Sequence, residues 1–482
     1  PTLRSSRALP QSAAPPRNLT MSAAREEEEE EEPASLLLRL EPTASRLAAI
    51  CRLDLRKAGL KRLPASIGLC ATCLEQLDVG GNPLESLDGV QTLGRLRVLF
   101  ATGCALGGRG LPAGGPLSRV DSLFMLSLKE NGLAVLDGEA LPPKLGWLIC
   151  AQNAIAEVRA PHRLSHVRKL MLSHNLLDAV AADLLIEAIP ALEMLRLACN
   201  RMETLPAAAF RHPRLAWFAF GGNPYSARLC AAALSAADAA ADAVATLKDA
   251  SEVAVGEEEL GRGSGAVVKR GTWQGTPVAC KLWSAELFSD GDARGEWLMG
   301  RLTGGCASLV RTLAAWETPS LGMAVELLEG ASAVGGPPSF ASVTRDAFVE
   351  GKHARLTPAQ AREVARAVAR AGAWLHARGL AHCDIYLHNT LRVAETEVVK
   401  LSDLGAACAY DRHGHTAVEK LEVRSFGLLL LDLLSHLQVS HDGTFGGGEA
   451  AAAAAALRHA AAACTAESLE ARPSFAELCA EL

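Results

Sequence analysis

The sequence predicts an α/β solenoid built from short repeats, followed by a separate α+β domain. Two observations support this division. A short apolar-x-apolar pattern recurs from about residue 45 to residue 226, and an ordered series of glycine-rich, lysine-containing and aspartate-containing motifs follows residue 251. The chain has 482 residues, of which 49% are hydrophobic and 21% charged. This is a globular composition, long enough for two or three domains.

Eight copies of the repeat pattern align on paired strand residues: Leu53/Leu55, Leu77/Val79, Leu99/Ala101, Leu126/Leu128, Leu148/Cys150, Leu170/Leu172, Leu195/Leu197 and Phe218/Phe220. Most copies continue with an Asn, as at Asn82 and Asn131, whereas Ala58 and Cys104 occupy that position in two of them. The spacing resembles the roughly 20–29-residue period of leucine-rich repeats. Each unit is too small to bury its own apolar residues, so neighbours must stack into one core. The Asn side chains are expected to satisfy backbone groups in the turns.

The variable strand positions of this array are expected to face its concave side, where a protein ligand would bind. They are Asp54, Asp78, Phe100, Ser127, Ile149, Met171, Arg196 and Ala219. The row is mixed in charge and character, so it predicts protein recognition without naming the protein.

Five motifs mark the second domain: GRGSGAVV at 261–268, VACK at 278–281, HCDIYLHN at 382–389, KLSDLG at 400–405, and EKLEVRSFG at 419–427 with RPSF at 472–475. Their kinds and order resemble those of protein kinases. Together with the repeats they are similar to soluble plant and algal leucine-rich-repeat protein kinases. This resemblance implies an α/β leucine-rich-repeat solenoid followed by a two-lobed α+β protein kinase-like domain. It also implies that ATP and Mg²⁺ are bound.

The resemblance assigns roles to individual residues. Asp384 would accept the proton of the substrate hydroxyl, while Asn389 and Asp403 hold Mg²⁺. Lys281 would bind the ATP phosphates and pair with Glu296 on the next helix, for which Glu286 is the alternative. The residues expected to bind the nucleotide are Gly261, Gly263, Gly265, Val268, Ala279, Lys281, Glu326 and Leu328.

Departures from the kinase pattern leave a second function open. Cys383 replaces the usual Arg of the loop, and Tyr386 stands where Ser/Thr kinases have a Lys that helps neutralise the transferred phosphoryl group. The segment from Asp403 to Glu422 is short and lacks an A-P-E motif. The chain is therefore expected to be a protein kinase, with Ser/Thr as the nearest prediction, or a pseudokinase scaffold that binds ATP weakly or not at all.

The predicted domains are a disordered acidic tail over 1–44, the repeats over 45–226, a linker over 227–250 and the kinase-like domain over 251–482. Within the linker, the Ala-rich stretch from Leu229 to Ala250 is expected to form a polar helix or a semi-rigid connection. The true start is open, since Met21 precedes a run of seven Glu and residues 1–20 also resemble a transit peptide. A net charge of −6 gives no reason to expect nucleic acid. Thirteen scattered Cys and the lack of a long apolar run predict a cytoplasmic protein with protein substrates and no membrane span.

Overall fold

A computed structural model describes residues 17–20 and 44–482, apart from residues 109, 245, 248, 264, 289 and 439–446. Most of the predicted acidic tail therefore lies outside the described residues. The exception is β1 (Arg17–Thr20), which pairs in parallel with β2 (Ile50–Asp54) and so extends the sheet of the first domain. No helix in the described part of the chain is long and apolar enough to cross a membrane.

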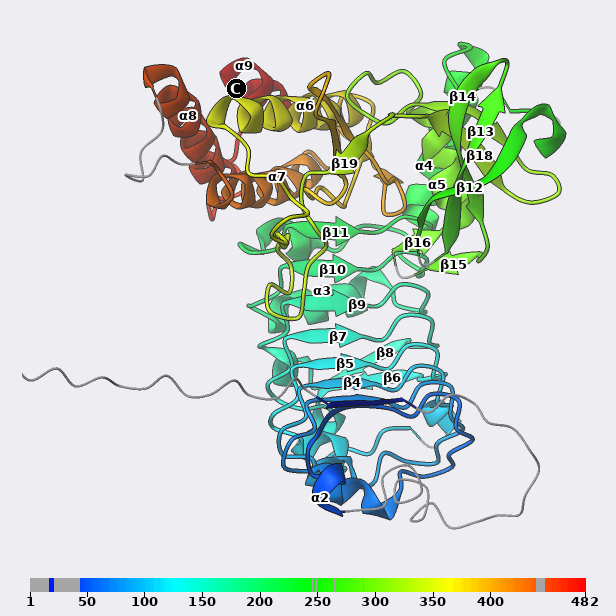
Figure 1. Ribbon diagram of the computed structural model, residues 1–482, viewed down its shortest axis with the longest axis vertical. Helices are drawn as coiled ribbons and strands as arrows, with labels where there is room; N and C mark the ends of the chain where they lie inside the picture. The colour runs from blue at the N-terminus through cyan, green and yellow to red at the C-terminus, as the bar shows by residue number, and fades with distance from the viewer. Residues whose placement is uncertain are drawn as a thin grey trace, which may run out of the picture.

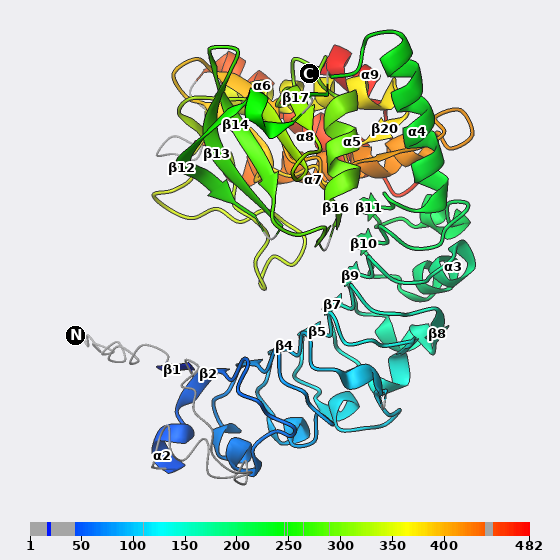
Figure 2. The ribbon, with the colours of Figure 1, turned by 90° about the vertical axis from the view of Figure 1, so that its right-hand side faces the viewer.

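The first domain is a curved stack of units whose strands form one nine-stranded parallel sheet (Figures 1 and 2). After β1 and β2, the sheet contains β3 (Gln76–Asp78), β4 (Val98–Phe100), β5 (Met125–Ser127), β7 (Trp147–Ile149), β9 (Lys169–Met171), β10 (Met194–Arg196) and β11 (Trp217–Ala219). Each strand pairs with the next unit, so the apolar residues of all units form one continuous core. We call this domain the array.

The return segments of the array are mostly short 3₁₀ helices. They are η1 (Ala65–Cys70), η2 (Val90–Thr92), η3 (Leu106–Gly108), η4 (Leu117–Arg119), η5 (Gly138–Ala140), η6 (Pro161–Leu164) and η7 (Ala207–Arg211), with α2 (Ala44–Leu47), α3 (Ala179–Ala188) and the strand pair β6 (Val135–Asp137) and β8 (Glu157–Arg159). A short strand every unit and a short return on the other side give the array its curvature.

The Asn residues of the turns bond as the sequence predicts. Asn82 donates its side-chain N–H to the carbonyl of Val79 at 2.6 Å, and its Oδ1 accepts the amide of Leu60 in the previous unit at 3.0 Å. Cys104 replaces an Asn, and its thiol contacts the same Val79 carbonyl at 3.3 Å. Each side chain thus pairs backbone groups that the turn would otherwise bury without a partner.

Helix α4 (Pro224–Ala239) connects the array to the second domain and begins before the predicted boundary at residue 227. It packs against helix α5 (Ala293–Leu302), where Asp238 forms an ion pair with Arg301 at 2.5 Å. The carbonyl of Arg301 also accepts the amide of Val244 at 2.9 Å. The segment predicted as a linker is therefore a packed part of the fold.

The second domain has two lobes. The small lobe contains a five-stranded antiparallel sheet of β12 (Ala254–Arg262), β13 (Ala266–Trp273), β14 (Thr276–Trp283), β18 (Gly322–Glu326) and β17 (Thr312–Trp316), in that order, preceded by η8 (Ala250–Glu252). Between β14 and α5 lies a small hairpin of β15 (Leu287–Phe288) and β16 (Gly291–Asp292). The sheet and α5 lie next to each other at the upper right of Figure 1.

The large lobe is mainly helical. Its helices are α6 (Pro358–His376), α7 (Ala417–Ser435), α8 (Gly448–Cys464) and α9 (Phe475–Glu481); its strands are β19 (Ala331–Ala333), β21 (Thr390–Val393) and β22 (Val398–Leu401), with β20 (Leu380–Ala381) paired to β23 (Cys408–Ala409). Thr357 and Gln360 form a capping box that fixes the start of α6. The apolar face of α6, as the spacing of its apolar residues predicts, is buried in the lobe core.

The array packs against the large lobe along its own concave side (Figures 1 and 2). Phe340, in the loop between β19 and α6, lies 5.7 Å from the Trp147 ring and 6.5 Å from the Phe100 ring. Arg196 reaches the 382–389 loop. This corrects the expectation that the whole variable row faces a protein ligand, because the second domain of the same chain already covers Phe100 and Arg196; Asp54 and Asp78, at the other end of the row, stay partly exposed.

Candidate active site

A cavity of about 660 Å³ lies between the two lobes. It is lined by all of the residues predicted to bind a nucleotide, namely Gly261, Gly263, Gly265, Val268, Ala279, Lys281, Glu326 and Leu328. Glu296, Asp384 and Asp403 line it as well, whereas Asn389 contacts it through Asp384. A volume of this size suits a ligand as large as a nucleotide.

Lys281 is one of the residues that line this cavity. Its side chain extends from strand β14, directly after the buried residues Val278–Cys280, and forms an ion pair with Glu296 on α5. Asp403 lies on its other side, with its carboxylate 3.6 Å from the Lys281 ammonium. Burial opposes the charge on Lys281, but the two carboxylates prevail and raise the pKa of Lys281 above its ordinary value. The structure thus pairs Lys281 with Glu296 and leaves the competing Glu286 exposed.

Glu296 is held in place by a second donor and by its surroundings. Its side chain is almost fully buried, and its other oxygen accepts the Trp283 indole N–H at 3.2 Å. The residue lies in the first turn of α5, where a negative charge is favoured by the helix dipole. These contacts fix the carboxylate toward Lys281.

The glycine-rich loop joins β12 to β13 over the cavity. A Cβ atom on Gly261 would meet no atom within 4 Å, while one on Gly265 would lie 2.9 Å from the ring of Phe288. Gly265 is therefore required by packing inside the protein, and Gly261 leaves open space toward the cavity. Backbone N–H groups of glycine-rich loops can bind phosphate oxygens.

The 382–389 loop presents Asp384 at the edge of the cavity. The Asn389 amide donates to the Asp384 carboxylate at 2.8 Å and to its carbonyl at 3.0 Å, which fixes the aspartate side chain. Glu422, on α7, anchors the start of the loop by accepting the amides of His382 and Cys383. His382 is fully buried and bonds the Ser402 carbonyl at 3.1 Å.

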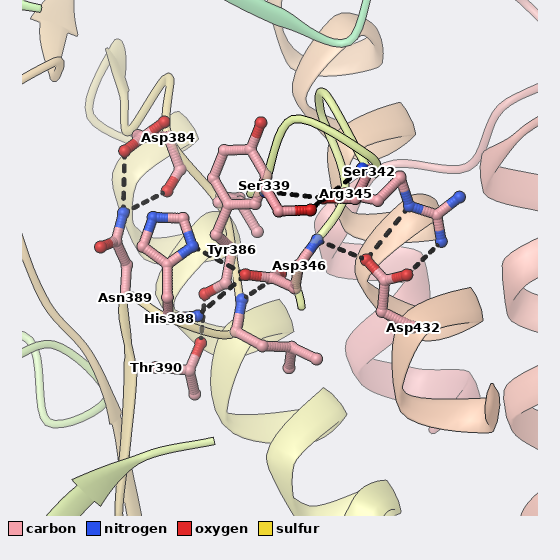
Figure 3. Close-up of polar contacts among 12 residues, drawn as sticks. Ser339, Ser342, Arg345, Asp346, Asp384, Tyr386, His388, Asn389, Thr390 and Asp432 are labelled. Atoms are coloured by element: carbon pink, nitrogen blue, oxygen red, sulfur yellow. Dashed lines mark hydrogen bonds and ion pairs between the residues drawn. The ribbon is translucent and has the colours of Figure 1, made fainter. Parts of the chain in front are cut away.

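The far end of the loop is anchored by Asp346, which comes from the segment before α6 (Figure 3). Its carboxylate accepts the Leu387 amide at 2.8 Å and the His388 ring N–H at 2.7 Å. The His388 side chain is therefore only 21% exposed. Burial disfavours its charge, but the hydrogen bond with Asp346 prevails and raises the pKa of His388.

The array covers the outer side of the same loop. Arg196 forms an ion pair with Asp384, donates to the Cys383 carbonyl at 2.8 Å and lies 3.1 Å from the carboxylate of Asp290. Trp217 stacks on Tyr386 with ring centroids 4.6 Å apart and donates its N–H to the Ile385 carbonyl at 3.1 Å. The Arg196 side chain is almost fully buried here. A cation and a large aromatic ring from the first domain thus lie against the loop that contains Asp384.

Burial of Asp384 favours its neutral form, but the positive charge of Arg196 prevails and the pKa of Asp384 falls below its ordinary value. The aspartate is therefore ionised at neutral pH. An ionised carboxylate at this position can accept a hydroxyl proton or orient the hydroxyl toward a phosphate.

The nucleotide-binding role predicted for Glu326 is restricted by bonds that this residue already makes. Its amide donates to the Arg311 carbonyl at 2.9 Å, and its carboxylate binds Lys400 at 2.5 Å and Arg311 at 3.3 Å. The whole segment from Glu326 to Ala331 lines the cavity. The amide of Glu326 is thus not available to a ligand.

A comparison with family models provides the decisive observation about this domain. The family described as protein kinase domain matches residues 255–425. Residues 255–425 are a protein kinase domain. No curated protein matches the chain. The match includes Lys281, Glu296, Asp384, Asn389 and Asp403, and it supports protein kinase activity.

The kinase domain also depends on residues that sequence reasoning did not assign to the site. Glu422 falls inside the quoted 419–427 motif, which therefore gave a signal for its importance. Asp346, Phe288 and Asp290 lie outside every quoted motif, and only their positions in the fold bring them to the 382–389 loop or to the cavity. Arg196 was assigned to ligand recognition, because nothing in the repeat pattern indicates which side chains meet the kinase domain.

The residues of the kinase domain suit a magnesium ion that is shared with phosphates. Within the described residues, no group of three or more His, Cys, Asp or Glu side chains is arranged to hold a metal by itself. Mg²⁺ typically binds through one or two protein carboxylates together with substrate phosphates. Asp403, half-exposed and lining the cavity, has the oxygen chemistry for that role, and the side-chain oxygen of Asn389 is of the same class.

Proposed function

We propose that this protein is a protein kinase that transfers the γ-phosphoryl group of ATP to a protein hydroxyl, most naturally that of Ser or Thr. The observation that carries the proposal is the convergence of Lys281, Glu296, Asp384 and Asp403 on one cavity of nucleotide size. Phosphoryl transfer depends mainly on positioning and on charge stabilisation, and these side chains supply both.

In this proposal Lys281, held by Glu296, binds the phosphates of ATP, and the glycine-rich loop covers them. Asp403 and Asn389 hold Mg²⁺, which neutralises charge on the phosphates when it is bound. Asp384 orients the acceptor hydroxyl and takes its proton. The adenine end lies against Val268, Ala279 and Leu328 at the other end of the cavity.

The repeats are proposed to be leucine-rich repeats that recognise a protein. The recurring Asn turns and the nine-stranded parallel sheet support this assignment. The part of the concave face proposed for a protein ligand is restricted to the amino-terminal units, around Asp54 and Asp78, where the kinase domain leaves the strands partly exposed.

A labelled-ATP assay on the full chain tests the enzymatic proposal. Wild type, Asp384→Asn and Lys281→Met are compared for phosphate transfer to a generic acceptor protein and to the chain itself. Transfer by wild type that disappears in both variants is expected. Transfer that persists in Asp384→Asn would contradict the role given to Asp384.

The alternative is a pseudokinase scaffold, and one observation favours it. Arg196 is bonded to Asp384, and Trp217 covers Tyr386, so the array lies where a polypeptide acceptor would approach the loop. A scaffold of this kind predicts no phosphate transfer, even when Mg²⁺ and ATP raise the unfolding temperature of wild type. The same assay therefore separates the two functions.

A further inference from the structure

The hairpin of β15 and β16 touches two parts of the nucleotide site. The Phe288 ring fills the space beside Gly265 of the glycine-rich loop, and it lies next to Gly405 of the Asp403-containing motif. A Cβ atom on Gly291 would lie 2.6 Å from the Gly405 carbonyl, so hairpin and motif are in direct contact. The position of the hairpin therefore affects both sides of the proposed phosphate site.

The hairpin also sets the start of helix α5. Asp292, its last residue, caps the helix by accepting the Gly295 amide at 2.7 Å. Glu296, the partner of Lys281, directly follows Gly295 in the helix. Because the cap and Glu296 are separated by one helical turn, a shift of Asp292 moves the Glu296 carboxylate relative to Lys281.

The array holds this hairpin from outside the kinase domain. The His174 ring nitrogen Nε2 is 2.7 Å from the Gly291 carbonyl and 3.1 Å from the Phe288 carbonyl, so it acts as an N–H donor shared between the two strands. Cys199 donates its thiol to the Asp292 carboxylate at 3.0 Å. His174 and Cys199 follow β9 and β10 in corresponding turns of neighbouring units, where both residues have a left-handed backbone with φ near 57° and 55°.

These contacts differ from an ordinary surface between domains. His174 bonds main-chain carbonyls on both strands of the hairpin, which fixes their spacing whatever the side chains of β15 and β16 are. Helix α5 is also held at its other end, where Arg301 pairs with Asp238 of α4. The array and its connecting helix thus hold both ends of the helix that contains Glu296.

We propose that His174 is a positioning residue of the nucleotide site, which acts through the β15–β16 hairpin to keep Glu296 paired with Lys281. The array then does more than recognise a partner: it completes the small lobe. The inference deepens the proposed function, and only its nucleotide-binding test rests on that function.

The variant His174→Asn removes the contact with little effect on the array itself. Asn tolerates the left-handed backbone of this turn, so the turn is preserved while the side chain no longer reaches the hairpin. His174→Gln retains an N–H donor with a longer reach and serves as the conservative variant. His166→Asn, at an exposed position in the same unit, is the matched control.

Hydrogen–deuterium exchange on the full chain without nucleotide tests the positioning role independently of ATP. Deuterium uptake over residues 293–302 is expected to rise several-fold in His174→Asn, to rise less in His174→Gln and to match wild type in His166→Asn. Equal uptake in wild type and His174→Asn overturns the inference. So does an equal rise in the His166→Asn control.

Binding of Mg²⁺-ATP tests whether the effect passes through Glu296. The Kd of His174→Asn is expected to be several-fold higher than that of wild type, and this ratio is expected to fall to about one when both proteins also contain Glu296→Gln. The same ratio in both backgrounds overturns the route through Glu296. If wild type does not bind Mg²⁺-ATP, the proposed function fails, and the exchange measurement alone decides the role of His174.

Discussion

The cavity between the lobes and the contact of the array with the 382–389 loop contain the same arrangement of charged side chains. In the cavity, Lys281 lies between Glu296 and Asp403; at the contact, Arg196 lies between Asp384 and Asp290. Each is a buried cation flanked by two carboxylates. They differ in origin, since Lys281 meets partners in its own domain, whereas Arg196 belongs to the array and meets Asp290 and Asp384 of the second domain, the latter 188 positions later in the chain.

This difference shows that the two clusters depend on different parts of the chain. The Lys281 cluster has the residues for binding a nucleotide and forms within the kinase domain. The Arg196 cluster forms only when the array is docked, and it fixes the ionisation and the surroundings of Asp384. The first cluster therefore bears on whether ATP can bind, and the second on what can reach Asp384.

The largest expected effect is on the rate of catalysis and comes from Asp384, which belongs to the Arg196 cluster and also lines the cavity. Asp384→Asn keeps the shape of the side chain and removes its ability to accept a proton, so the rate of phosphate transfer is expected to fall about 10²–10⁴-fold. Steady-state rates at saturating ATP measure this. Binding of Mg²⁺-ATP is expected to be nearly unchanged, and a rate close to that of wild type would show that Asp384 is not the acceptor of the proton.

The next largest effect is on stability, from removing the interdomain cation. Arg196→Met leaves the largely buried Asp384 and the partly exposed Asp290 without that charge, and breaking a buried ion pair of this kind typically costs about 3–5 kcal/mol. Urea unfolding of the full chain measures the free energy. Arg52→Met, at an exposed position on β2, is the control and is expected to change it by less than about 0.5 kcal/mol.

The variant Lys281→Met tests whether the two clusters differ in their contribution to stability. They would not differ if Lys281→Met lowered the free energy of unfolding as much as Arg196→Met does. Glu296 keeps the Trp283 indole as a hydrogen-bond donor when Lys281 is replaced, and Asp403 is half-exposed. We therefore expect Lys281→Met to cost less stability than Arg196→Met. The reverse order would contradict this account.

The His388–Asp346 pair gives the kinase domain a pH dependence. Because the pKa of His388 is raised in the folded protein, its contribution to stability is fully present below about pH 6.5 and is lost as the pH rises through the folded-state value. His388→Asn is thus expected to be less stable than wild type by about 1–2 kcal/mol at pH 6, with a smaller difference at pH 9. A difference that grows with pH would show that the neutral imidazole is the stabilising form.

The smallest expected effect tests whether the contact of the second domain with the middle units of the array contributes to stability. Phe340→Ala removes a half-exposed ring from beside Phe100 and Trp147, and such aromatic contacts are worth about 0.5–1.5 kcal/mol beyond burial. Unfolding in urea again measures the change. Phosphate transfer and Mg²⁺-ATP binding are expected to stay at wild-type levels, because the Phe340 ring packs on Phe100 and Trp147, which belong to neither cluster.

Much of the fold was readable because its signals are local. The repeats are recognisable since each unit must bury the same strand residues and satisfy the same turn, and the Asn contacts follow from that requirement. The association of Lys281 with Glu296 also follows from short-range spacing, a strand that ends in Lys followed by a helix. The exposed or buried state of His388 was not readable, because Asp346 reaches it from a segment with no pattern of its own.

The sequence by itself determined the order of the domains, the units of the array and the residues that converge on the cavity, because periodicity and motif spacing depend on contacts between near neighbours. Tertiary structure alone decided which face of the array meets the kinase domain. The physical reason is that docking brings together Arg196 with Asp384 and His174 with the β15–β16 hairpin, and the free energy of such pairs depends on burial that no single segment of sequence encodes.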